Sequence, residues 1–137
     1  QSRLQYRLDV SADCLDESIP AMILQPLVEN AWSHGILPKD GHRGIIRIDA
    51  EVREEALIVT VTDDGVGITP EKSRELNAQL SEVNYEAADS EKGSGVALKN
   101  VNNRIKLSDG PEYGLTLFPA EGGGCRVVMK VKRKQNE

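Results

Sequence analysis

The sequence predicts an α+β fold, a two-layer α/β sandwich in which about three helices cover one face of a mixed, mostly antiparallel sheet. Residues 44–52 and 56–62 alternate between apolar and polar side chains, which is typical of a β-hairpin. Residues 20–35 and 95–107 instead carry apolar side chains at helical spacing. The 137 residues, 39% of them hydrophobic, suffice for one domain with a single core.

The N-terminal part of the chain is predicted to form a strand followed by a helix. Residues 4–10 alternate, and one face of this strand is apolar: Leu4, Tyr6, Leu8 and Val10. A polar loop follows at residues 13–18. Pro20 suits the first turn of a helix that continues to about Gly35, because the N–H that proline lacks has no helical partner there. The apolar face of this helix consists of Ile23, Leu24, Leu27, Val28 and Ala31.

The middle of the chain is predicted to contain the hairpin, a short helix and a loop. A turn at residues 39–44 precedes the hairpin, whose apolar face carries Ile46, Ile48, Leu57, Val59 and Val61. Thr69-Pro70-Glu71 is typical of a helix start, and the helix extends to Leu80. Residues 81–94 are polar and poor in large aliphatic side chains, so we expect a mobile loop that acts as a lid.

The C-terminal part is predicted to add a second long helix and two strands. In the helix at residues 95–107, the side chains expected to face inward are Ala97, Leu98, Val101 and Ile105. Strands at residues 114–118 and 125–132, joined across Gly122-Gly123-Gly124, then complete the sheet.

Composition excludes several classes of protein. The net charge of −5 argues against a nucleic-acid binder, which would carry a basic patch. Cys14 and Cys125 show no C-x-x-C spacing, so we expect two free cytosolic thiols. No run of 18 apolar residues predicts a membrane span, and we expect no membrane contact by this segment. The chain begins at Gln1 rather than Met, so residues 1–137 are expected to be one domain of a longer protein.

Three short motifs together predict a pocket for Mg-ATP: Glu29-Asn30-Ala31, Asp63-Asp64-Gly65-Val66-Gly67 and Gly93-Ser94-Gly95. The amide oxygen of Asn30 is a hard, neutral ligand suited to Mg²⁺. On a helical wheel, Asn30 and His34 share one border of the apolar arc. Asp63 follows a strand, and its carboxylate can accept a hydrogen bond from the exocyclic amine of adenine, which guanine lacks at that position.

Glycines accompany both parts of this predicted pocket. Gly65 and Gly67 lack the Cβ atoms that would block a base, and Gly93-Ser94-Gly95 opens a helix whose free N–H groups can bind phosphates. Each motif alone has an ordinary alternative: a buried structural asparagine, a surface Asp-Gly turn, and a Gly-Ser hinge. Their joint occurrence favours the nucleotide site.

The same motifs resemble those of a known superfamily. Residues 19–31, with His34-Gly35, resemble the asparagine box of the GHKL ATPases, and Gln25-Pro26-Leu27-Val28-Glu29-Asn30 more narrowly resembles the catalytic domain of LytS/YesM-type sensor histidine kinases. Residues 63–68 are similar to the first glycine box of that domain. Residues 93–105 are similar to its second glycine box and the following helix.

The resemblance implies the Bergerat fold with ATP and Mg²⁺ as ligands. Asn30 would ligate Mg²⁺ and, with His34, act at the reacting phosphate, while Asp63 would recognise adenine. The nucleotide-binding residues would be Asn30, Asp63, Gly65, Gly67, Ile68, Lys92, Gly93, Ser94, Gly95, Val96, Leu98 and Arg104. Many relatives place a lysine three residues after the box asparagine, where this chain has Ser33. The charge near the γ-phosphate must then come from Mg²⁺, Lys92, Lys99, Arg104 or His34, and the sequence leaves these open.

The resemblance also implies partners and a location. Full-length relatives are dimeric membrane sensors that phosphorylate a histidine on their own dimerisation domain and pass the phosphoryl group to a response regulator. This segment would be the cytoplasmic catalytic domain of such a bacterial inner-membrane sensor, and its longer protein a homodimer. Neither His34, inside the nucleotide box, nor His42, in a Gly-flanked turn, has the setting of a phosphoacceptor.

Three interpretations of function compete at this point. The domain is the ATP-binding half of a histidine kinase, a GHKL ATPase or serine kinase of the anti-sigma type, or a nucleotide-binding docking module without catalysis. The stretch from Gln25 to Asn30 favours the kinase. In hydrolytic relatives, the residue four before the box asparagine is a glutamate that activates water, whereas here it is Pro26.

Overall fold

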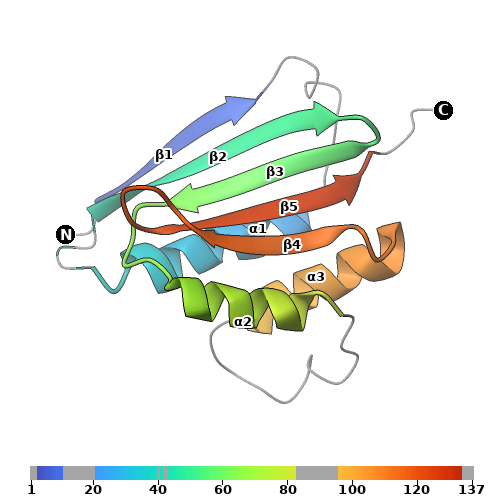
Figure 1. Ribbon diagram of the computed structural model, residues 1–137. Coiled ribbons are helices and arrows are strands. Elements are labelled where there is room, and N and C mark those ends of the chain that lie inside the picture. The colour runs from blue at the N-terminus through green and yellow to red at the C-terminus, as the bar shows by residue number, and fades with distance from the viewer. Residues whose placement is uncertain (1–2, 11–20, 40, 42, 83–95, 134–137) are drawn as a thin grey trace.

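The computed structural model describes residues 3–10, 21–39, 41, 43–82 and 96–133 (Figure 1). Side chains are described for these residues except at positions 3–10, 21, 22 and 96. The elements in chain order are β1 (Arg3–Val10), α1 (Ala21–Asn30), the π-helix η2 (Ala31–Ile36), β2 (Arg43–Arg53), β3 (Ala56–Asp63), α2 (Pro70–Leu80), α3 (Val96–Asp109), β4 (Gly114–Pro119) and β5 (Cys125–Lys132).

These strands form one five-stranded sheet in the order β1-β2-β3-β5-β4. β1 runs parallel to β2, while the pairs β2–β3, β3–β5 and β4–β5 are antiparallel. Figure 1 shows the helices on one face of this sheet. The predicted two-layer α/β sandwich with a mixed, mostly antiparallel sheet is therefore confirmed.

The core lies between the sheet and the helices, and the strand register explains its composition. Leu57 pairs with Val131, Val59 with Met129, and Val61 with Val127 across β3 and β5. All six side chains are buried, because residues two apart on a strand face the same layer. The helices contribute Leu27, Ala31, Leu76, Leu80, Leu98, Val101 and Ile105 to the same core.

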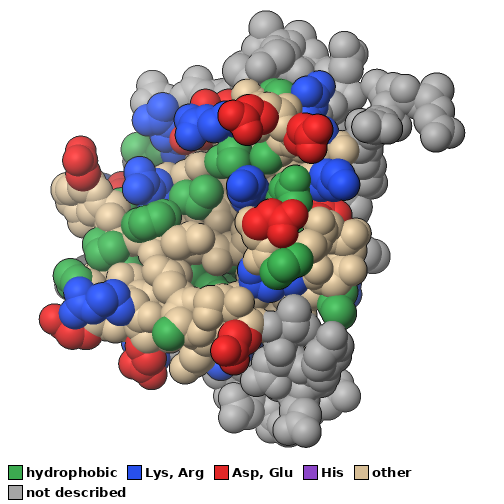
Figure 2. Space-filling model, turned by 45° about the vertical axis from the view of Figure 1, so that its right-hand side comes forward, with side chains coloured by type: hydrophobic (Ala, Val, Ile, Leu, Met, Phe, Trp, Pro, Cys, Tyr) green, Lys and Arg blue, Asp and Glu red, His purple; other side chains and the backbone are tan. Residues whose placement is uncertain are grey.

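The opposite face of the sheet carries charged side chains and is covered by none of the described helices (Figure 1). On β2, Arg47 pairs with Asp49 at 3.2 Å and Arg53 with Glu51 at 2.8 Å. Basic and acidic side chains are interspersed over the side of the molecule that Figure 2 presents. Among the residues the structure describes, no helix is both long and apolar enough to cross a membrane.

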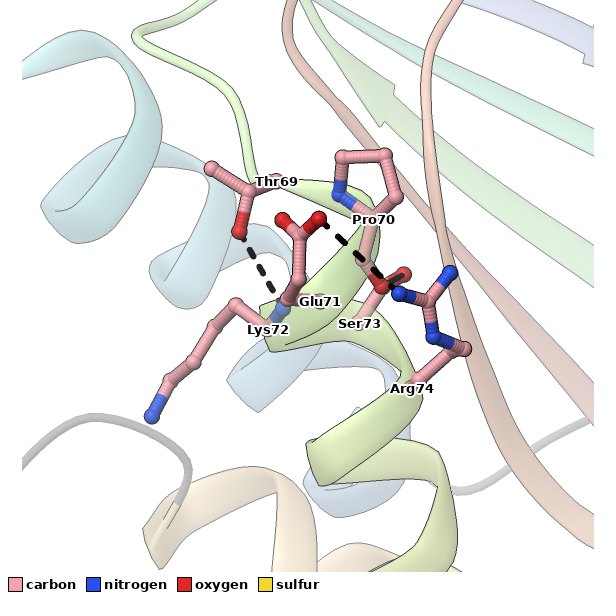
Figure 3. A network of polar contacts seen from close by, with 6 residues as sticks. All are labelled: Thr69, Pro70, Glu71, Lys72, Ser73 and Arg74. Carbon is pink, nitrogen blue, oxygen red and sulfur yellow. Dashed lines mark hydrogen bonds and ion pairs between the residues drawn. The ribbon is translucent and has the colours of Figure 1, made fainter.

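The start of α2 is fixed by local contacts (Figure 3). The hydroxyl of Thr69 accepts a hydrogen bond from the backbone N–H of Lys72 at 3.1 Å, and Pro70 takes the first helical position. The hydroxyl of Ser73 donates to the carbonyl of Pro70 at 2.9 Å. The predicted helix from Thr69-Pro70-Glu71 to Leu80 is therefore confirmed.

Two asparagines attach the helices to the outer edge of β4, a feature the sequence analysis missed. The side chain of Asn77 in α2 donates to the carbonyl of Leu117 at 2.9 Å and accepts from its N–H at 2.8 Å. Asn102 in α3, which is 1% exposed, accepts from the N–H of Leu115 at 2.9 Å and donates to the carbonyl of Leu80 at 2.7 Å. Three of these bonds satisfy backbone groups that the edge strand β4 leaves unpaired, and the bond to Leu80 joins α3 to the end of α2.

The helix predicted at residues 20–35 is helical from Ala21 to Ile36, but it is α-helical only to Asn30, and the π-helical turn that follows changes the angle between successive side chains. One expectation from helical periodicity was wrong. Ala97 is exposed rather than buried. The buried stripe of α3 runs through Leu98, Val101, Asn102 and Ile105, and Ala97 lies about 90° from its centre at 100° per residue.

Several predicted segments lie wholly or largely outside the described residues. The polar loop at 13–18, Cys14 and His42 are among them. Of the predicted lid at residues 81–94, only residues 81 and 82 are described. The remaining strands lie within one or two residues of their predicted bounds.

Candidate functional site

A cavity of about 170 Å³ lies over the sheet between the α1/η2 segment and α2. It is lined by Asn30, His34, Gly35, Asp63, Gly67, Ile68, Lys72, Leu76, Leu98, Leu117 and Cys125. The structure thus brings together six of the predicted site residues: Asn30, His34, Asp63, Gly67, Ile68 and Leu98. The helices, the strands β3, β4 and β5 and the segment after β3 all contribute, so the cavity exists only in the folded chain.

Asp63 is a buried acid in this cavity and the last residue of β3. It is 4% exposed, and its Oδ1 accepts a hydrogen bond from the N–H of Gly65 at 2.8 Å. Burial raises the pKa of Asp63 and the charge of Asp64 adds to the effect, while hydrogen bonds from the backbone of Gly65 and Cys125 oppose it. The carboxyl group is thus held in one orientation, where it can accept a hydrogen bond from a ligand.

Three glycines leave room around Asp63. A Cβ atom on Gly35 would lie 2.5 Å from Oδ1 of Asp63, and one on Gly124 would overlap the carbonyl oxygen of Asp63. A Cβ atom on Gly65 would overlap the backbone of Gly35. Because these three residues are glycines, the end of η2 can pack directly against the end of β3.

Of the two glycines predicted to lie beside the base, Gly65 and Gly67, only Gly67 lines the cavity. Gly67 lines the cavity and has a φ of +87°, which favours glycine. Gly65 is not among the residues that line the cavity, and its Cα faces the backbone of Gly35. The N–H of Val66 donates to the carbonyl of Gly35 at 2.9 Å and closes this contact.

The π-helix η2 positions the side of the cavity that Asn30 and His34 form. Asn30 is half-buried where α1 meets η2, and His34 is exposed. The N–H of Leu37 bonds to the carbonyl of Trp32 at 2.8 Å, a spacing of five residues. Short π-helical turns are frequent at functional sites. Glu29 is exposed and accepts a hydrogen bond from Gln25 at 2.9 Å. It is not among the lining residues.

Five lining residues were not among the predicted site residues: Gly35, Lys72, Leu76, Leu117 and Cys125. Lys72 and Leu76 lie four residues apart on one face of α2, a signal that helical periodicity could have revealed. Leu117 and Cys125 come from β4 and β5, and only sheet pairing brings them to the cavity.

Cys125 is a free, buried thiol beside Asp63. Burial and the charge of Asp63 raise the pKa of Cys125 to about 12, so the thiol is neutral at physiological pH. A neutral, buried thiol contributes small apolar surface rather than a nucleophile or a metal ligand.

Other predicted residues lie elsewhere or outside the described part of the chain. Arg104 is exposed on α3 and does not line this cavity, and Lys99 lines a separate cavity of about 560 Å³ between α2 and α3. Val96 begins α3, but its side chain is not described. Lys92, Gly93, Ser94 and Gly95 lie outside the described residues.

Comparison with known proteins gives this arrangement a family. Residues 15–135 match the family model of the histidine kinase-, DNA gyrase B- and HSP90-like ATPases. The chain is 34% identical over 129 residues to the protein YwpD of Bacillus subtilis (strain 168), covering 93% of this chain and 42% of the relative.

Two further relatives are sensor proteins. The sensor histidine kinase YesM of Bacillus subtilis (strain 168) is 30% identical, with 96% of this chain and 20% of the relative covered. The sensor protein LytS of Enterococcus faecalis (strain ATCC 700802 / V583) is also 30% identical, with 99% and 22% covered. The chain therefore spans about a fifth to two fifths of the length of these relatives.

Solved structures agree on the fold. The catalytic domain of the histidine kinase ThkA matches with a TM-score of 0.66 at 17% identity, over 97% of this chain and 82% of that one. The histidine kinase domain of the blue-light activated kinase EL346 from Erythrobacter litoralis matches with a TM-score of 0.60 at 16% identity, over 96% and 52%. This chain therefore belongs to the GHKL ATPase family, as an ATPase domain of the kind found in LytS/YesM-type sensor histidine kinases.

Proposed function

We propose that this domain binds Mg-ATP in the cavity between α1/η2 and α2 and donates the γ-phosphoryl group to a histidine on a dimerisation domain of the longer protein. The observation that carries the proposal is the buried carboxylate of Asp63, 4% exposed in a cavity that also presents Asn30 and His34. A buried acid directed at a cavity is a typical recognition group for a ligand's hydrogen-bond donor.

Adenine fits the chemistry around Asp63. The carboxylate would accept a hydrogen bond from the exocyclic amine, and the apolar side chains of Ile68, Leu76, Leu98 and Leu117 would contact the faces and edges of the ring. Guanine would instead turn a carbonyl oxygen toward the carboxylate, and two acceptors repel one another. The site should therefore favour ATP over GTP.

Asn30 suits a role as the protein ligand of Mg²⁺. Its amide oxygen is hard and neutral, and magnesium commonly takes few protein ligands together with phosphate oxygens and waters. Within the described residues, no group of three or more His, Cys, Asp or Glu side chains could hold a metal alone. The ion would therefore enter with the nucleotide and offset part of the charge that the phosphates bring to an acidic chain.

The residues at the phosphate end support transfer rather than hydrolysis. Position 26 is a half-buried proline with no side-chain base to activate water, and the nearby Glu29 bonds to Gln25 at 2.9 Å. His34, at the exposed end of the cavity, would donate a hydrogen bond to the phosphates. In the transfer step, a ring nitrogen of the acceptor histidine forms the bond to the γ-phosphorus as the bond to the bridging β,γ-oxygen breaks. Mg-ADP leaves.

The proposed partners of the domain are those expected of a sensor histidine kinase, the kind of protein that YesM is. In the longer protein, we propose a homodimer in which this domain lies on the cytoplasmic side of the membrane. The phosphoryl group would then pass from the acceptor histidine to an aspartate of a response regulator.

Labelling with γ-³²P-ATP tests the proposal. The 137-residue chain should not label itself, but should label the separately produced dimerisation domain of a LytS/YesM-type relative, and Asn30→Ala should abolish this transfer. Rapid, Asn30-dependent release of phosphate without an acceptor would favour the ATPase alternative. Failure to bind any nucleotide in calorimetry would favour the docking module.

A further inference from the structure

We propose that Lys72 of α2 is a positioning residue that contacts the phosphates of the bound nucleotide, an inference that rests on the proposed binding of ATP. Among the described residues that line the cavity, Lys72 is the one Lys or Arg. It is separate from Lys92, Lys99 and Arg104, the basic residues that sequence reasoning considered for this role.

The position of Lys72 along the cavity favours phosphate over base. It lies four residues before Leu76 on α2, so the two side chains share the face of the helix that lines the cavity. Its side chain is 47% exposed, whereas Asp63 is 4% exposed. The ammonium group therefore belongs to the open end of the cavity, while the carboxylate that would bind adenine lies at the closed end.

The electrostatics of the cavity favour a cation at that end, in addition to the Mg²⁺ that would enter with the nucleotide. Asp63 is an acid inside the cavity, Asp64 follows it, and the whole chain has a net charge of −5. A polyphosphate entering this environment is repelled unless positive charge lies close to it. Lysine is a common phosphate ligand that acts as a mobile point charge on a long stem.

The existing contacts of Lys72 leave its ammonium group available. Its ion pair with Glu75 spans 3.9 Å, and the Glu75 side chain is 60% exposed, so water and salt screen the pair strongly. The backbone N–H of Lys72 bonds to Thr69, which fixes the residue without using the side chain. Figure 3 shows the Lys72 side chain extending away from the Thr69, Glu71 and Arg74 contacts.

The alternative is an ordinary solvated lysine, and a matched pair of variants separates the two. Lys72→Met removes the proposed contact. Arg74→Met removes the same charge from the same helix, at a 72% exposed side chain that does not line the cavity. Lys72→Arg retains a cation at the proposed position. Circular dichroism and thermal melting would check that each variant folds like the parent chain.

The experiment measures the affinities of adenosine, Mg-ADP and Mg-ATP by calorimetry, with NMR titration for the weaker adenosine. Lys72→Met should weaken Mg-ADP and Mg-ATP by about 5- to 20-fold and adenosine by less than about twofold, since only phosphates bear the complementary charge. Arg74→Met should change all three by less than about twofold, and Lys72→Arg should restore most of the lost affinity. The Lys72→Met loss should shrink as salt is raised from about 0.05 to 0.5 M.

Two results would overturn the inference while leaving the proposed function standing. Equal losses in Lys72→Met and Arg74→Met would mean that only the overall charge matters. An equal loss for adenosine would mean that Lys72 supports the base or the fold. If the unaltered chain binds none of the three ligands, the proposed function fails and this inference fails with it.

Discussion

Replacing Asp63 with asparagine should weaken ATP binding by about 10- to 150-fold and leave the weak binding of GTP nearly unchanged. The substitution keeps the shape of the side chain and removes its charge. In the proposed complex, the carboxylate accepts a hydrogen bond from the exocyclic amine of adenine. An asparagine NH₂ at that position would face the amine as a second donor, and the bond would be lost.

The magnitude follows from the surroundings of the side chain. A hydrogen bond to a charged acceptor contributes about 1.5–3 kcal/mol, which corresponds to the stated range of affinity. Oδ1 of Asp63 accepts from the N–H of Gly65 at 2.8 Å, and the amide oxygen of asparagine can accept the same bond. Burial disfavours the ionised carboxyl, so a neutral side chain is tolerated at this site. The variant should therefore fold, and the loss of affinity should report on the missing acceptor.

Isothermal titration calorimetry with ATP and GTP is the appropriate assay. Asp64→Asn is the matched control, because it makes the same change in charge one residue away, at an exposed side chain that bonds the N–H of Ile45 at 2.8 Å and does not line the cavity. A folded Asp63→Asn chain with unaltered ATP affinity would remove Asp63 from the nucleotide site. Equal affinity of the parent chain for ATP and GTP would refute the proposed recognition of the base.

Four further predictions concern stability, pH and turnover. Asn102→Ala should lower the free energy of unfolding by about 2–3 kcal/mol in urea titrations, because it leaves two buried backbone groups unpaired; a loss below about 0.5 kcal/mol would contradict this. Gly65→Ala should lower the free energy of unfolding by about 3 kcal/mol or more, because the new Cβ would overlap the backbone of Gly35. Gly122→Ala should lower it by only about 1–2 kcal/mol, because the space around Gly122 is open and only its positive φ disfavours alanine. Because burial raises the pKa of Asp63, the folded chain binds that proton more tightly than the unfolded chain. Lowering the pH through this raised pKa should therefore stabilise the parent chain relative to Asp63→Asn, as urea titrations from about pH 7 to pH 4 would show. The same protonation should weaken ATP binding, which calorimetry over the same pH range would measure, because the neutral carboxyl is a poorer hydrogen-bond acceptor. Phosphate release from ATP by the isolated chain should be very slow, and a coupled phosphate assay showing fast, Asn30-dependent release would contradict the kinase assignment.

The sequence by itself determined the features that depend on neighbours along the chain. Alternation fixed which side chains of β2 and β3 face the core, because a strand presents residues two apart to the same layer. Thr69 and Pro70 fixed the start of α2, because a hydroxyl and a missing N–H satisfy the first turn locally. The motifs around Asn30 and Asp63 were recognisable because their spacing is short.

Only the tertiary structure decided the features that depend on contacts between distant segments. The π-helical turn at residues 31–36 places Gly35 against Asp63 and Gly65, and helical periodicity alone gives no sign of such a turn. Periodicity says which face of an element is buried but not which partner covers it. For this reason Cys125 could not be assigned to the cavity from the sequence, nor could Asn102 be assigned to the edge of β4. Both positions follow from the order of the strands and the packing of the helices on them, which bring residues far apart in the chain within hydrogen-bonding distance.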